Sequence, residues 1–205
     1  IVRSTDNGSS FSTVTSRTSN HLTGVTFGNN TFVGVGRSGN IVRSTDNGTT
    51  WDNATSPTDK DLTEVTFGNN TFVAVGESGN IVRSTDNGTT FDNATSPTTK
   101  YLWGVGFGNN TFVAVGNSGN IVRSTDNGSS FDNVTSPNSG QNHYEVAFGN
   151  NTFVVVQHRQ YIVRSEDNGA SFNDASSRGV ANNYYGVGFG NNTFVAVGGL
   201  SGKIV

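Results

Sequence analysis

The chain has 205 residues, a formal net charge of −3, 32% hydrophobic residues, 27 glycines, and no cysteine or methionine. Without cysteine there are no disulfides, thiolate zinc sites or cysteine nucleophiles. Nucleic-acid binding is disfavoured because phosphate neutralisation needs a basic face, and no apolar run is long enough to cross a membrane. The lack of methionine, even at position 1, indicates a processed chain, a segment of a longer protein or an engineered one.

One eight-residue segment, Ile41-Val-Arg-Ser-Thr-Asp-Asn-Gly48, recurs almost letter for letter. The other copies begin at Ile1, Ile81, Ile121 and Ile162, and a fragment restarts at Ile204. The steps between copies are 40, 40, 40, 41 and 42 residues. A period near 40 built from short β-type runs and tight turns predicts a β-propeller or a solenoid.

The repeat at residues 61–97 shows the predicted elements in chain order. Strands are expected at Leu62–Phe67, Thr71–Val75, Asn80–Thr85 and Thr89–Ala94. The turns at 68–70 and 86–88 contain Gly and Asn, which tolerate positive φ and favour hairpins, and Pro97 ends the sheet. Four short antiparallel strands per repeat are typical of a propeller blade, whereas solenoid strands are usually parallel and joined by longer turns.

We therefore expect one all-β domain over residues 1–205, a five-bladed β-propeller of four-stranded antiparallel blades. Complete blades are predicted at 21–57, 61–97, 101–137 and 143–177. Residues 1–17 supply the third and fourth strands of the closing blade, and residues 184–205 supply its first and second strands plus a stub. Such a clasp, with two strands from each terminus, leaves no unpaired edge. The stub Ile204-Val205 duplicates Ile1-Val2, so it is either frayed or continues into further repeats of a longer parent chain.

Each repeat also carries the pattern Ser/Thr-x-Asp-x-Gly-x-Thr/Ser-Trp/Phe, as in Ser44-Thr-Asp-Asn-Gly-Thr-Thr-Trp51. Five matches in register resemble the Asp-box (BNR-type) propellers over the whole chain. The phrase Phe72-Val-Ala-Val-Gly-x-Ser-Gly, running into the next Asp-box, looks most like the photosystem II assembly-factor branch, with sialidase-like repeats also similar. The resemblance implies structural roles in the turns for the Asp-box aspartates, which are Asp6, Asp46, Asp86, Asp126 and Asp167. One carboxylate per turn is too few for a calcium loop, so no metal and no cofactor are expected.

The copies differ mainly in two connections, between the second and third strands and between blades. Both connections fall on one face of the disc, and variable loops on a rigid frame are where recognition usually lies. Neutral drift in tolerant loops is the alternative interpretation. The candidate ligand-binding residues on this face are Trp103, Tyr144, Tyr185, Tyr101, His21, Arg37, Glu77 and Arg159. Exposed rings suit stacking on sugars or anchoring a protein partner. Glu64 and Glu145, on innermost strands, are expected to be solvated in the channel.

Enzymatic activity is not expected. A sialidase needs one asymmetric set of arginines, a Tyr–Glu pair and an acid, whereas this chain consists of near-copies, and adjacent Tyr144 and Glu145 point to opposite faces of a strand. The prediction is a non-catalytic, multivalent binding module for a glycan or a protein, and with a glycan ligand it would be a lectin. The alternatives are a structural or assembly scaffold, one unit of a longer surface repeat protein, or an engineered propeller. Asn-x-Ser/Thr tripeptides in tight turns favour a prokaryotic or designed origin, and an extracellular or cell-surface location is the expectation.

Overall fold

The computed structural model describes residues 1–175 and 183–199. Its strands form four complete four-stranded antiparallel sheets and two sheets of two strands. The complete blades are β3 (Leu22–Gly28), β4 (Thr31–Gly36), β5 (Ile41–Ser44) and β6 (Asp52–Asn53); β7 (Leu62–Gly68), β8 (Thr71–Gly76), β9 (Ile81–Ser84) and β10 (Asp92–Asn93); β11 (Leu102–Gly108), β12 (Thr111–Gly116), β13 (Ile121–Ser124) and β14 (Asp132–Val134); and β15 (His143–Gly149), β16 (Thr152–Gln157), β17 (Ile162–Ser165) and β18 (Asn173–Asp174). The half-blades are β1 (Val2–Arg3) with β2 (Ser12–Thr13), and β19 (Asn183–Gly190) with β20 (Thr193–Gly199).

The chain is thus an all-β propeller with the strand complement of five antiparallel blades. Within each complete blade the strands pair in sequence order, as the hairpin turns predict. Both asparagines of the first turn, for example Asn69 and Asn70, have positive φ. The short connection after the second strand forms a 3-10 turn, at Arg37–Gly39 (η1), Glu77–Gly79 (η2), Asn117–Gly119 (η3) and His158–Gln160 (η4). The fourth strands are shorter than predicted, because the Asp-box turn takes up most of the expected length.

The blades pack face to face through buried second strands. Val33 and Val35 of β4 are fully buried in one cluster with Leu62 and Val65 of the next blade. The same arrangement recurs between later blades. At each junction a glycine that ends one first strand lies against the ring of a phenylalanine in the next blade, in the pairs Gly28–Phe67, Gly68–Phe107, Gly108–Phe148 and Gly149–Phe189. The repeated junction explains why a chain with so little apolar content folds: each internal junction buries the facing sides of two neighbouring blades.

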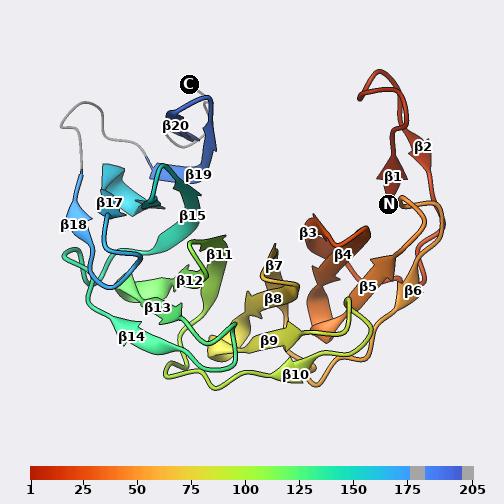
Figure 1. The fold of residues 1–205 in the computed structure, drawn as a ribbon, viewed down its shortest axis with the longest axis horizontal. Helices are drawn as coiled ribbons and strands as arrows, with labels where there is room; N and C mark the ends of the chain where they lie inside the picture. The colour runs from red at the N-terminus through yellow and green to blue at the C-terminus, as the bar shows by residue number, and fades with distance from the viewer. Residues whose placement is uncertain (176–182, 200–205) are drawn as a thin grey trace.

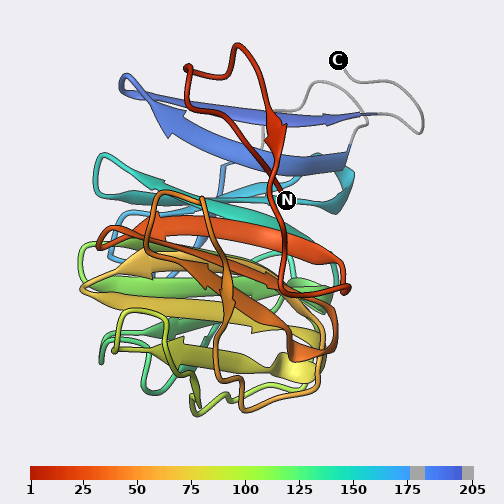
Figure 2. The same cartoon turned by 90° about the vertical axis from the view of Figure 1, so that its right-hand side faces the viewer.

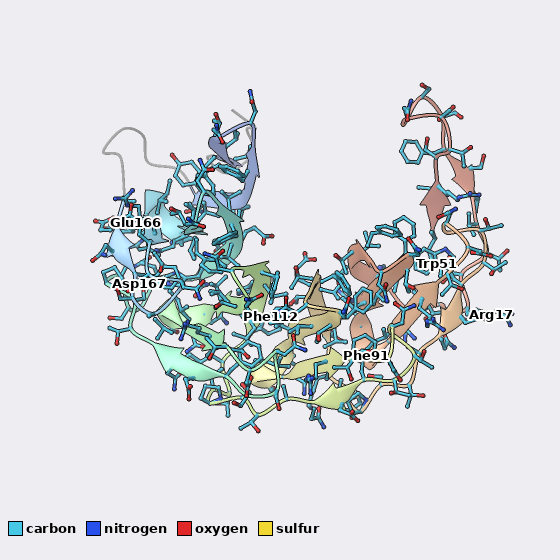
Figure 3. The ribbon with its side chains drawn as sticks, in the orientation of Figure 1. Arg17, Trp51, Phe91, Phe112, Glu166 and Asp167 are labelled. Carbon is cyan, nitrogen blue, oxygen red and sulfur yellow. The ribbon has the colours of Figure 1, made fainter. Side chains whose placement is uncertain are left out.

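The blades follow an open arc, with β1–β2 at one end and β19–β20 at the other (Figure 1). The first strands line the inside of the arc and cross its thickness in the side view (Figure 2). The labelled Trp51, Phe91 and Phe112 lie within the body of the arc, whereas Arg17 and Glu166 lie on its outer rim (Figure 3). No helix in the described part of the chain is long and apolar enough to span a membrane.

The predicted clasp is not joined in this structure. The two halves have the expected strands, since β19–β20 are a first and second strand and β1–β2 a third and fourth, but they are separate sheets. The same glycine–phenylalanine contact recurs at the four internal junctions, and the two ends of the arc that these junctions build lie apart (Figure 1). The predicted stub at 204–205 lies outside the described residues, as does most of the variable loop at 178–184.

Candidate functional site

Every first strand carries a β-bulge near its N-terminal end. The register of each first strand against the second shifts around one residue, between Leu62 and Glu64 in the second complete blade and at the same place in the other blades. Bulges re-aim a side chain and commonly lie next to binding sites. The five residues at the bulges are Thr23, Thr63, Trp103, Tyr144 and Tyr185. The bulges therefore present threonine on two successive strands and aromatic rings on the next three.

The three aromatic bulge residues form a continuous row that begins at Tyr101. The ring centroids of Tyr101 and Trp103 are 4.2 Å apart, those of Trp103 and Tyr144 6.4 Å, and those of Tyr144 and Tyr185 5.0 Å. The interplanar angles lie between 34° and 57°, so neighbouring rings are tilted against one another. Tyr185 is 53% exposed and Trp103 36%. Rings with this much exposure are available to a ligand.

Two hydrogen bonds fix the direction of exposed rings in the row. The indole Nε1 of Trp103 donates to Oδ1 of Asn117 at 2.7 Å. The amide of Asn183 donates to the hydroxyl of Tyr185 at 3.0 Å. Asn117 belongs to η3, which follows the second strand, so the variable connection of the blade orients the ring on its first strand. A fixed ring loses less conformational entropy on binding.

These residues line one cavity of about 470 Å³. Its lining residues are Thr23, Arg37, Asp61, Leu62, Thr63, Tyr101, Trp103, Tyr144 and Tyr185. The structure therefore brings five of the eight candidates from the sequence together, namely Trp103, Tyr144, Tyr185, Tyr101 and Arg37. A volume in this range suits a small ligand or a short peptide segment.

The opposite side of the cavity is polar and charged. Nε of Arg37 lies 4.0 Å from Oδ2 of Asp61, and the other carboxylate oxygen of Asp61 accepts the N–H of Ser38 at 2.8 Å. Burial raises the pKa of the Tyr101 hydroxyl, and the charges of Asp61 and Glu77 raise it further, while Arg37 opposes them. Tyr101 therefore stays neutral, and it stands at the end of the aromatic row that lies near the Arg37–Asp61 pair.

Three candidates from the sequence do not line this cavity. His21 is exposed before β3, and its carbonyl accepts the N–H of Arg37 at 2.9 Å. Glu77 is half-buried in η2 and acts on the cavity only through its charge on Tyr101. Arg159 is exposed in η4, where it has a positive φ of 60° and donates its backbone N–H to Asn183. These residues lie on the same two kinds of connection as the cavity residues but do not line the cavity.

Sequence reasoning left Asp61, Thr63 and Asn117 out of the candidate set. A signal for Asp61 was present, because it occupies the repeat position of Tyr101 and His21. Thr63 shares the bulge position with Trp103; its hydroxyl donates to the carbonyl of Leu102 in the next blade at 2.8 Å. Asn117 could be found only from its contact with the indole.

The Asp-box aspartates are turn-stabilising groups in this structure. Asp46 accepts the Ser44 hydroxyl at 2.8 Å, the Thr50 N–H at 2.9 Å and the Thr50 hydroxyl at 2.7 Å. These bonds, those from Thr50 first, lower the pKa of Asp46 to about 2. The other four Asp-box aspartates also have a pKa of about 2; for Asp86 and Asp126 burial is the largest influence and raises it, but the hydrogen bonds together outweigh burial. No three His, Asp or Glu side chains converge anywhere in residues 1–175 and 183–199.

Glu64 and Glu145 are less solvated than expected. Each lies on an innermost strand and accepts the N–H of the following valine at 3.0 Å. Each also packs over a glycine of the preceding blade: a Cβ on Gly24 would lie 3.0 Å from Oε1 of Glu64, and one on Gly104 3.2 Å from Oε1 of Glu145. Burial raises the pKa of both carboxyls, that of Glu145 to about 7, with the Val146 N–H opposing and Glu64 adding.

Comparison with known proteins gives structural neighbours only. No protein-family model matches the chain, and no curated protein matches it in sequence. Among solved structures, it is similar to YCF48 bound to D1 peptide, with a TM-score of 0.73 and 18% identity over 96% of this chain and 67% of that one. YCF48 from Cyanidioschyzon merolae gives 0.71 and 17%, over 96% and 73%. An ancestral GH74 enzyme gives 0.72 and 19%, over 87% and 27%. At these identities the likeness shows the fold alone: the chain is a β-propeller.

Proposed function

We propose that this propeller is a non-catalytic binding module that holds an extended peptide segment of a protein partner against its inner wall. The observation that carries the proposal is the aromatic row from Tyr101 to Tyr185 around one cavity. Bulges on three successive first strands present its Trp103, Tyr144 and Tyr185. Partly exposed Trp and Tyr side chains supply large contact areas at a low entropy cost, and they dominate binding energies at protein interfaces.

The ring geometry favours a peptide over a sugar. Stacking on a pyranose needs an open ring face, whereas here each ring is tilted against its neighbour at centroid distances of 4.2–6.4 Å. Neighbouring rings therefore do not combine into one flat stacking surface. Apolar or proline side chains of an extended peptide fit between such rings, and the Arg37–Asp61 pair supplies polar partners at one end. A solved propeller of similar fold is described as bound to a peptide, which supports this ligand class.

The test begins with a phage-displayed library of random twelve-residue peptides selected on the wild-type chain. The recovered peptide is then titrated against Trp103→Ala and Tyr185→Ala. We expect each substitution to raise Kd at least about tenfold, as is usual for an anchoring aromatic residue. Tyr161→Ala is the matched control: Tyr161 is 37% exposed, close to the 36% of Trp103, but does not line the cavity.

A glycan array run on the same wild-type chain separates the two ligand classes. Peptide binding that depends on Trp103 and Tyr185, together with a blank array, supports the proposal. Sugar binding lost in the same two variants, without any selectable peptide, would assign the cavity to a glycan. Peptide binding that survives both substitutions but is lost in Tyr161→Ala would place the ligand elsewhere.

A further inference from the structure

The two ends of the arc expose the surfaces that the internal junctions bury. Nine large hydrophobic residues are exposed in the described part of the chain, and six of them lie at the ends: Val2, Phe11, Val25, Phe27, Val195 and Val197. Val195 and Val197 of β20 are 58% and 53% exposed, whereas Val33 and Val35 at the same repeat positions of β4 are fully buried. Exposed apolar surface concentrated in this way marks an interaction site.

The N-terminal end carries the counterpart of that surface. In the second complete blade, Val65 is 3% exposed because β4 of the preceding blade covers it. Val25, at the same position of β3, is 62% exposed, and Phe27 is 50% exposed. Beside them a groove of about 490 Å³ runs between β3 and the half-blade β1–β2, lined by Ile1, Val2, Phe11, Leu22 and Val25 among others. The groove is apolar and adjoins the free edge of β1.

The two ends also carry the hydrogen-bonding groups and the glycine that form contacts at the internal junctions. Within the arc, an Asp-box asparagine donates to a threonine of the preceding blade, in the pairs Asn87–Thr31, Asn127–Thr71 and Asn168–Thr111, at 2.6–2.7 Å. Asn47, the equivalent asparagine of the first complete blade, has no threonine of a preceding blade to donate to. Thr193, the equivalent threonine of β20, receives no such bond from a following blade. Both are exposed. Likewise the four internal glycines meet a phenylalanine ring, whereas a Cβ on Gly190 would meet nothing within 4 Å.

We infer that the β19–β20 end of one molecule docks onto the β1–β3 end of a second copy, forming a fifth blade from two chains. The internal junctions set the contacts: Val195 and Val197 cover Val25, Phe27 packs on Gly190, and Asn47 donates to Thr193. β20 then pairs with β1 in the register of β8 with β9, which places Val195 opposite Arg3 and Val197 opposite Ile1.

A second copy is the occupant that fits the rigid arc. For a chain to fill its own groove, the four internal junctions would have to rotate together, and their valines and glycine–phenylalanine pairs are packed without space. A second copy needs only to dock, because its end already has the shape of the missing blade half. The contact is head-to-tail, so it closes into a ring or continues as a filament according to the rotation.

Disulfide trapping tests this pairing, since the chain contains no cysteine of its own. Opposed residues in antiparallel strands have Cα atoms about 4.5–5.5 Å apart, within disulfide range. Equal amounts of an Arg3→Cys chain and a Val195→Cys chain are mixed under mild oxidation. We expect a linked heterodimer in the mixture well above any linked product of either chain alone. No linked heterodimer overturns the proposal.

A chain carrying both cysteines identifies the occupant. Linked dimers and higher multiples support docking between copies, whereas an internal disulfide at monomer mass overturns it and assigns the groove to the same molecule. Sedimentation of wild type against Gly190→Ala and Val195→Asp gives an independent readout. Both variants should weaken self-association at least about tenfold while the blades stay folded, and Tyr161→Asp, an exposed substitution away from both ends, should not. Unchanged association in the two end variants also contradicts the inference.

Discussion

Gly68 lies directly against the ring of Phe107 in the next blade, in a space that no side chain on residue 68 could share. The contact recurs at every internal junction and is absent only at Gly190, within the described residues. A substitution at Gly68 therefore probes packing inside the arc, whereas the same substitution at Gly190 probes the exposed end. The two glycines offer a matched pair of substitutions.

Gly68→Ala should destabilise the protein by about 2 kcal/mol, since a Cβ there overpacks a rigid interface. Gly190→Ala should change the stability of the separate chain by less than about 0.5 kcal/mol, because surface substitutions away from special features have small effects. Urea unfolding of both variants at a concentration low enough to prevent association checks this. Equal destabilisation by the two substitutions would show that the junction glycines are chosen for backbone conformation rather than space.

The Asp-box aspartates predict loss of stability in acid. Their pKa of about 2 lies below the usual 3.8. A carboxylate with a lowered pKa stabilises the folded state above the unfolded pKa, and this stabilisation is lost as the pH falls through the folded pKa. Stability should therefore decline between about pH 4 and pH 2. The measurement is thermal unfolding across this range, with the double variant Asp46→Asn and Asp126→Asn showing a shallower pH dependence. A flat profile in wild type would contradict the assigned hydrogen bonds.

Glu145 predicts that stability changes with pH in the opposite direction. Its pKa is raised to about 7 by burial, so the folded state holds its proton more tightly than the unfolded state. Stability should accordingly fall as the pH rises from about 4.5 to about 7 and then level off. Glu145→Gln stays neutral, so its stability relative to wild type should rise over that range by about 3 kcal/mol. Glu77→Gln serves as the control. An unchanged difference between Glu145→Gln and wild type from pH 4 to pH 8 would mean that Glu145 is solvated, as the sequence alone suggested.

Asn117 is predicted to act on binding through Trp103. Its Oδ1 accepts the indole N–H at 2.7 Å and makes no contact with the cavity itself. Asn117→Leu should leave thermal stability nearly unchanged and weaken peptide binding severalfold, because Trp103 loses its fixed orientation. Asn117→Asp, which keeps an acceptor, should restore most of the affinity. Calorimetric titration with the selected peptide provides the readout, and equal loss in both variants would argue against orientation as the cause.

The fold was predictable because each repeat contains the local turn and strand signals of a blade. Asn69-Asn70 and Asp86-Asn-Gly88 specify hairpins locally, and the valine-rich second strands specify burial on both faces. The clasp was not predictable in the same way. Strand counting shows that the terminal halves are complementary, but it does not say how far apart the two ends of the packed blades lie, which becomes visible only in three dimensions.

Some residues of the candidate site were also predictable from the sequence, and others were not. Trp103, Tyr144 and Tyr185 stood out because they replace threonine at one repeat position, and their convergence follows from the shared bulge. His21, Glu77 and Arg159 were chosen from the variable loops, where sequence does not reveal the direction of a side chain. Asn117 was missed because its role depends on a hydrogen bond between two connections of its blade.

The most direct measurement of the proposed binding role uses Trp103 as its own reporter. Trp51 is buried beneath its blade, at the position that Phe91 and Phe131 fill elsewhere, so Trp51→Phe leaves a single exposed indole in a folded chain. Titrating this variant with the selected peptide should shift the emission of Trp103 to shorter wavelength and saturate, and Tyr185→Ala in the same background should move the midpoint at least about tenfold. Saturating peptide binding with no change in Trp103 emission would contradict the assignment of the aromatic row as the binding surface.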